Sequence, residues 1–133
     1  MAEKELINFD GFLKHGPHVP HGVKCGDLVF FSAIRPPKPD GTLADTPLEQ
    51  AEDTFANLQR LMEGIGGSLL DVLQVQVSVG DPSHIRPMNE VWYRLFPMDS
   101  NPTARQVIQA GAHGGGTAQM YSLFVIARNP DSR

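Results

Sequence analysis

The segment Met120–Ala127 most restricts what this chain can fold into, because it reads as a β-strand that is apolar on both faces. Successive side chains of a strand point to opposite faces of its sheet. One face of this segment carries Tyr121, Leu123 and Val125, and the other carries Met120, Phe124 and Ile126. Soluble monomers rarely expose a large apolar patch, so both faces of the sheet that contains this strand must be covered.

Two amphipathic helices are predicted, and each has a single apolar face. Thr46-Pro47-Leu48-Glu49 is a capping box with proline at the first helical position, and Gly64, Gly66 and Gly67 end the helix that follows. Its apolar face consists of Leu48, Ala51, Phe55, Leu58, Leu61, Met62 and Ile65. The second helix has Pro87 near its start and an apolar stripe of Ile85, Met88, Trp92 and Phe96.

Three further strands are predicted, at Leu28–Ile34, Leu73–Val79 and Ala104–Ala110, with an additional hairpin around Val19–Lys24. Two one-sided helices and one sheet predict a two-layer α/β sandwich, with both helices on the same face. That arrangement leaves the other face of the sheet bare. Because the last strand is apolar on that face too, we expect sheets of several subunits to pack together in a homo-oligomer.

Length, net charge and cysteine count indicate one domain and disfavour nucleic-acid binding and membrane insertion. The 133 residues predict one domain over 1–133, with a mixed-charge lead-in at 1–14 and a polar tail at 129–133. The net charge is −4 and no basic cluster occurs, which disfavours nucleic acid as a partner. No apolar run approaches the roughly 20 residues that cross a membrane. A mixed-charge N-terminus and a single cysteine lead us to expect a cytoplasmic protein.

Arg105 stands at the start of a predicted strand whose next residues on the same face are Val107 and Gln109. A guanidinium that enters a sheet requires an anionic partner, and its planar fork matches a carboxylate. A structural salt bridge at the sheet edge would meet the same requirement. On spacing alone, the salt bridge is the stronger interpretation.

Three histidines, His15, His18 and His21, recur at every third residue of the segment HGPHVPHG. In a polyproline-like conformation three residues make one turn, so these side chains would share one side and could hold a metal ion. The simpler interpretation is an exposed polar loop. We expect no metal and no other cofactor.

Four segments of the chain together resemble the reactive intermediate deaminase (YjgF-like, RidA-like) family. These are VFFSAIRP, MNEVWYRLF, PTARQVIQAGA and LFVIAR, and they follow one another with the order and gaps of the family. The resemblance covers roughly residues 15–128. Its most specific element is the proline-x-arginine pattern that leads into a strand, which occurs here as Pro102-Thr103-Ala104-Arg105.

The resemblance implies a chorismate-mutase-like fold with a mixed sheet, and a homotrimer whose active sites lie between neighbouring subunits. It implies a hydrolase of C–N bonds that converts enamines and imines, such as 2-aminoacrylate, to 2-keto acids and ammonia. Arg105 would then hold the substrate carboxylate, beside the backbone amide of Val107. Ser32 and Asn89 would line the same pocket.

The sequence departs from the family pattern at four places, one of which is Ile34, where the family often has a glutamine. The last-strand glutamate that is thought to position water is Ser122 here, and a serine is no general base without a partner that takes its proton. The tyrosine of the glycine-proline-tyrosine motif is His18, a candidate to replace the lost acid or base. Arg35 replaces an apolar residue and would favour a larger or dicarboxylic substrate, such as an aminomuconate.

Two function classes therefore compete. The first is a deaminase with an altered pocket, in which Arg105, His18 and Ser122 are the catalytic candidates. The second is a non-catalytic protein that keeps the carboxylate clamp and binds a keto acid or a similar metabolite, and the loss of the glutamate favours it. A nuclease or translation-inhibiting activity, attached to some relatives, is disfavoured by the acidic charge.

Overall fold

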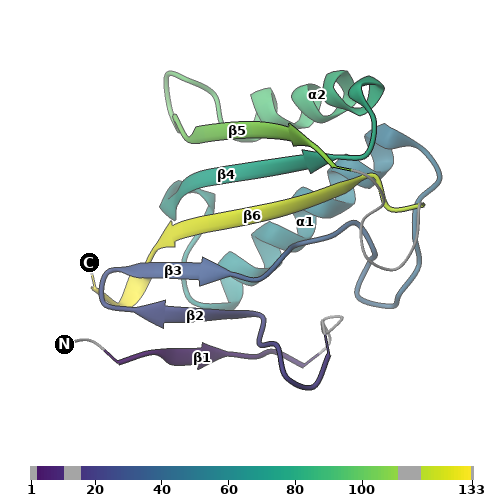
Figure 1. Cartoon of the computed structure of the whole chain (residues 1–133). Helices are drawn as coiled ribbons and strands as arrows, with labels where there is room; N and C mark the ends of the chain where they lie inside the picture. Colours follow the sequence, from purple (N-terminus) through teal and green to yellow (C-terminus); the bar gives the residue numbers. More distant parts are fainter. Residues whose placement is uncertain (1–2, 11–15, 111–117, 133) are drawn as a thin grey trace.

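A mixed sheet of six strands forms one layer of the protein, in the order β1-β2-β3-β6-β4-β5 (Figure 1). This computed structural model describes residues 3–10, 16–110 and 118–132. The strands are β1 (Glu5–Ile7), β2 (Gly22–Cys25), β3 (Leu28–Phe31), β4 (Val72–Val79), β5 (Ala104–Gln109) and β6 (Tyr121–Arg128). Only β4 and β5 pair in parallel, and α2 connects them, whereas the other neighbours are antiparallel.

The two predicted helices are α1 (Pro47–Gly64) and α2 (Ile85–Leu95). At the start of α1 the Thr46 hydroxyl accepts from the backbone N–H of Glu49, as the capping box predicts. The carboxylate of Glu49 then accepts from the same hydroxyl at 2.8 Å instead of reaching the backbone. The helix ends as predicted, because Gly66 adopts a positive φ of 87° and Gly67 donates to the carbonyl of Met62.

Both helices cover the same face of the sheet, which confirms the predicted two-layer α/β sandwich (Figure 1). The core lies between these layers. Its sheet side consists of alternate residues of the two central strands, namely Val75, Val77 and Val79 of β4 and Tyr121, Leu123 and Val125 of β6. This face therefore matches the period-two pattern that predicted it.

The opposite face of the sheet is bare and partly apolar. Phe124 of β6 is 61% exposed and Phe30 of β3 is 39% exposed. Phe30 lies directly opposite Ile126 in the antiparallel pair of β3 and β6. Met120 differs from the prediction: it precedes β6 and packs against the core, so it does not extend the bare face.

The N-terminal part of the sheet differs from the sequence-based expectation. β1 lies within the predicted lead-in and pairs with β2, which in turn pairs with β3 across the turn at Gly26-Asp27. The hairpin expected around Val19–Lys24 is thus shifted toward β3. The strand expected over Leu28–Ile34 ends at Phe31, and Ile34 makes an isolated bridge to Leu123.

Gly22 permits the close approach of β2 to β3. A Cβ atom at this position would lie 2.6 Å from the carbonyl oxygen of Phe30, which is too close for any side chain. None of the helices among the described residues is long and apolar enough to cross a bilayer.

Candidate active site

Arg105 lies on β5, an edge strand, and its side chain points toward the helix layer. The parallel register places Arg105 beside Val75, Val107 beside Val77 and Gln109 beside Val79. Residues paired in this way point to the same face of the sheet, and all three valines are fully buried beneath the helices. The prediction that these β5 residues share a face is therefore confirmed, and the face is the one that α2 covers.

Three side chains of α2 contact the guanidinium of Arg105. Its Nη1 donates to Oδ1 of Asn89 at 2.8 Å and lies 3.7 Å from Sδ of Met88. The central carbon of the guanidinium stands 5.1 Å from the ring centroid of Trp92, within the range of a cation–π contact. The structure thus brings together Arg105 and Asn89, two of the predicted substrate-binding residues.

The three α2 side chains that contact the guanidinium of Arg105, Met88, Asn89 and Trp92, are uncharged. The ion pairs among residues 3–10, 16–110 and 118–132 join Lys24 to Asp131 and Lys38 to Asp53, and neither includes Arg105. The alternative interpretation, a structural salt bridge at the sheet edge, therefore has no acidic partner in this part of the chain. The guanidinium of Arg105 is exposed and meets no competing carboxylate among the described residues, so it can bind an anionic ligand.

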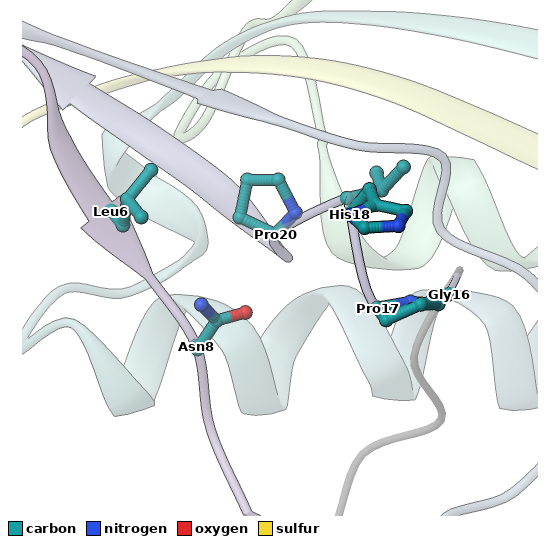
Figure 2. Close-up of a pocket in the computed structure, with 7 residues that line it drawn as sticks. Leu6, Asn8, Gly16, Pro17, His18 and Pro20 are labelled. Carbon is teal, nitrogen blue, oxygen red and sulfur yellow. The ribbon is translucent and has the colours of Figure 1, made fainter.

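His18 lies at a shallow pocket near the other edge of the sheet (Figure 2). The pocket lies between β1 and the segment that leads into β2, and Leu6, Asn8, Pro17 and Pro20 contribute to it with His18. The imidazole of His18 is exposed. The pocket therefore presents one titratable side chain to solvent.

The expected grouping of histidines does not form between His18 and His21. His18 is exposed, whereas His21 is buried and its Nδ1 accepts the backbone N–H of Phe9 at 3.0 Å. His15 lies outside the described residues. Where the chain is described, no group of three His, Cys, Asp or Glu side chains is arranged to hold a metal ion.

Ser32 fastens the segment that carries His18 to the end of β3. Its Oγ donates to the carbonyl of Pro20 at 2.8 Å, and its backbone N–H donates to the carbonyl of His21 at 2.9 Å. Pro20 itself lines the pocket. Ser32 and His18, two of the predicted site residues, therefore belong to one local structure.

Arg35 and Ser122 flank the bridge between Ile34 and Leu123. Ser122 lies on the bare face, directly opposite Ser78 of β4. The backbone carbonyl of Arg35 accepts from Nδ2 of Asn57 at 2.8 Å. The Nε atom of Arg35 is buried and finds no hydrogen-bond partner among the described residues.

These positions fall into separate groups within one chain. β1 and β5 are the two edges of the sheet, and the five strand spacings between them amount to about 24 Å. β3 runs in the same direction as β5, yet Ser32 follows the end of β3 while Arg105 is the second residue of β5. His18, near β1, therefore lies at the opposite edge and the opposite end of the sheet from Arg105, and Ser32, after the inner strand β3, lies at that opposite end.

Sequence reasoning missed two residues that contact Arg105. Trp92 was assigned to the core on its spacing, and its 6% exposure confirms this, but its ring also faces Arg105. Met88 was assigned only to the apolar stripe of the second helix. Their spacing relative to Asn89 puts all three side chains on neighbouring positions of one helix face, which is the signal that could have suggested the contact.

The comparisons with known proteins agree with this architecture. A family model described as Endoribonuclease L-PSP matches residues 12–117, and the chain belongs to this family, the YjgF/RidA family. Its fold is the chorismate-mutase-like YjgF fold. Both the predicted family and the predicted fold class are thus confirmed.

The relatives include solved structures that share the fold over 93% of this chain and a sequence relative that matches 69% of it. RidA from the Antarctic bacterium Psychrobacter sp. PAMC 21119 has 28% sequence identity and a TM-score of 0.82, over 93% of this chain and 98% of that chain. Protein HMF1 of Saccharomyces cerevisiae is 27% identical over 93 residues, 69% of this chain and 70% of the relative. TdcF of E. coli, solved with bound serine, has 20% identity and a TM-score of 0.81, over 93% of this chain and 98% of that chain.

Proposed function

We propose that this protein is a hydrolytic deaminase of a small enamine or imine that bears a carboxylate, and that it releases a 2-keto acid and ammonia. The observation that carries the proposal is Arg105, whose exposed guanidinium is oriented by Asn89, Met88 and Trp92 and has no acidic partner in the described chain. Such a group binds a carboxylate with two parallel hydrogen bonds. Membership of the YjgF/RidA family supports the same reaction class.

The reaction needs little beyond a positioned substrate and one water. In the imine tautomer, the water oxygen forms a bond to the carbon of the C=N group, and the π electrons move to nitrogen, which takes up a proton. The water oxygen loses one proton as it bonds to carbon, which gives a carbinolamine. The nitrogen then takes up a second proton, the C–N bond breaks and ammonia leaves, while the added oxygen loses its other proton and becomes the keto oxygen. Holding the carboxylate on Arg105 and the amide of Val107 fixes the reacting carbon and lowers the entropic part of the barrier.

A proton donor and acceptor would come from a neighbouring subunit. His18 and Ser32 lie too far from Arg105 in one chain, so a site that contains all three must form between copies of the chain. The bare apolar face with Phe30 and Phe124 supports such an assembly, and we propose a homotrimer. His18 then serves as the acid and base, a role in which histidine is the most common side chain.

Arg35 suggests the size of the substrate. Its guanidinium has a buried Nε without a hydrogen-bond partner in the described chain, an arrangement that a bound anion would relieve. Ser122, across the bridge from Arg35, supplies a neutral hydroxyl where the deaminase pattern has a glutamate. We therefore propose a dicarboxylic enamine of the aminomuconate type as the preferred substrate.

A second candidate function is binding without turnover. Ser122 lies on the bare face beside Ser78, and a serine does not accept a proton from water without a basic partner. If His18 does not compensate, Arg105 would hold a keto acid or a similar metabolite without reacting further. The serine bound to TdcF shows that one protein of this fold holds a small amino acid.

A coupled ammonia-release assay with 2-aminoacrylate generated in situ tests the proposal. Wild type is compared with Arg105→Ala and Ser122→Glu, and Arg86→Ala is the matched control because Arg86 is an exposed arginine at the start of α2. We expect turnover by wild type and by the control, and its loss in Arg105→Ala. A dicarboxylic enamine in the same assay tests whether Arg35→Ala selectively slows the larger substrate.

The other outcomes separate the two candidates. Activity that appears only in Ser122→Glu would mean that the scaffold is intact but that 2-aminoacrylate is not the natural substrate. If neither wild type nor any variant releases ammonia, and wild type binds keto acids saturably while Arg105→Ala does not, the binding function replaces the deaminase proposal.

A further inference from the structure

Side chains of α2 bind one edge of the Arg105 guanidinium and leave the other edge exposed to a ligand. Among the described residues, the hydrogen bonds of the Arg105 guanidinium use only Nη1, which points to Asn89 and Met88. Among the described residues, Nε and Nη2 of Arg105 donate to no protein group. One edge of the fork is therefore fastened to α2, and the other edge remains available to a ligand.

Trp92 fixes the plane in which that free edge lies. Its indole is 6% exposed and packs against Phe96 with ring centroids 4.4 Å apart, and against Phe55 at 6.1 Å in an edge-to-face arrangement. A ring held by two aromatic neighbours cannot turn without disturbing the core. The guanidinium that lies against it therefore rests on a rigid surface.

Arginine side chains lose considerable rotational freedom when they bind a ligand. An arginine that is already held by a rigid ring and an amide oxygen has lost part of that freedom before the ligand arrives, and binding becomes tighter by the corresponding amount. The groups around Arg105 achieve this without a carboxylate, which would compete with the ligand for the same donors.

We propose that Trp92 is the positioning residue of the carboxylate clamp, which orients Arg105 through its indole face while Asn89 fixes one edge of the fork. The inference rests on the proposed function only in that the ligand is a carboxylate; it holds equally for a deaminase and for a binding protein. It also makes Trp92 a reporter, because it is the single tryptophan of the chain and Arg105 lies against its ring.

Two measurements with pyruvate, 2-ketobutyrate and serine as probes test the inference. In the first, the fluorescence of Trp92 is followed while each probe is added to wild type and to Arg105→Ala. We expect a saturable change in wild type and none in the variant. In the second, calorimetry gives the Kd of the same probes for Trp92→Phe, Trp92→Leu and the core control Val29→Ala.

The variants separate positioning from core packing. Trp92→Phe keeps an aromatic face and should bind within a fewfold of wild type, whereas Trp92→Leu should raise the Kd by about tenfold. Val29→Ala shortens a fully buried core side chain of β3, which β6 and β4 separate from β5, so it should lower stability without changing the Kd. In the ammonia-release assay, Trp92→Leu should raise KM with a smaller effect on kcat.

Each other result decides against the inference. Equal Kd values for Trp92→Leu and Val29→Ala would reduce Trp92 to a core residue, even if Arg105 proves essential for turnover. If Trp92→Leu does not fold, the fluorescence of the wild type decides. If calorimetry shows that a probe binds and the Trp92 fluorescence does not change, the inference is overturned. If none of the three probes binds, the proposal that Arg105 binds a carboxylate is wrong, and the role of Trp92 is rejected with it. If Arg105→Ala and Trp92→Leu weaken probe binding but no ammonia is released by wild type, the inference holds and the proposed deaminase function is rejected.

Discussion

The amide oxygen of Asn89 accepts a hydrogen bond from Nη1 of Arg105 at 2.8 Å, and this contact connects α2 to the edge strand β5. An aspartate at position 89 would keep the geometry but add a negative charge. That charge would form an ion pair with Arg105 and compete with a carboxylate ligand for the same guanidinium.

We therefore expect Asn89→Asp to weaken substrate binding by at least tenfold while leaving the stability of the fold unchanged or slightly higher. The measurements are KM in the ammonia-release assay and the midpoint of thermal unfolding. Asn89→Ala is the control, since it removes the contact without adding charge and should have a smaller effect on KM. Tighter carboxylate binding by Asn89→Asp would contradict the role assigned to Arg105.

Gln50 fastens two loops to the start of α1 and should be important for stability. It is 1% exposed; its Nε2 donates to the carbonyls of Ala44 and Ala118, and its Oε1 accepts from the backbone N–H of Met120. Gln50→Leu removes the partner of these three backbone groups and the buried side-chain amide that holds them, and we expect it to lower the free energy of unfolding by about 3 kcal/mol. Chemical denaturation measures this. Gln59→Leu, at an exposed position of the same helix, should change little.

The bare face of the sheet should control self-association. Phe124 is the most exposed aromatic residue of that face, and Phe124→Glu should shift the protein from an assembly toward single chains without loss of helical circular dichroism. Sedimentation at a series of concentrations measures the change. Leu48→Glu alters an exposed leucine at the start of α1 and should leave the assembly intact. A wild type that sediments as a single chain would remove the basis for a site between subunits.

Tyr121 should make the protein unstable at alkaline pH. Burial raises its pKa well above the ordinary value, and its hydroxyl donates to the carbonyl of His84 at 2.6 Å. A group whose pKa is higher in the folded state contributes stability below the unfolded pKa of about 10 and loses that contribution as pH rises further. In Tyr93→Phe, where Tyr121 is the remaining tyrosine, phenolate absorbance should therefore appear only together with unfolding. Phenolate formation in the folded protein would contradict this.

The helices and central strands could be predicted because their signals are local. A capping box, an apolar stripe at helical spacing and strict alternation in β4 each depend on residues a few positions apart. β1 could not be predicted, since Glu5–Ile7 is a short charged segment that becomes a strand only by pairing with β2. Its existence depends on a contact between residues almost twenty positions apart.

The candidate site was predictable in its chemistry but not in its arrangement. The alternation of Arg105 and Val107 follows from the strand pattern, and the motif that precedes Arg105 pointed to carboxylate binding. The contact of Arg105 with Trp92 depends on how α2 lies across β5, which no local pattern specifies. The distance between His18 and Arg105 follows from the strand order, because sequence neighbours are not always sheet neighbours.

That strand order has a genetic consequence. If each chain contributes Arg105 to one interface and His18 to another, mixing two inactive variants can restore active sites at interfaces where each chain supplies its intact residue. In an equal mixture of Arg105→Ala and His18→Ala chains, about a quarter of the interfaces carry both intact residues, so co-expression should restore activity that neither variant has alone. The two defects would then behave as complementing alleles, although they affect a single reaction.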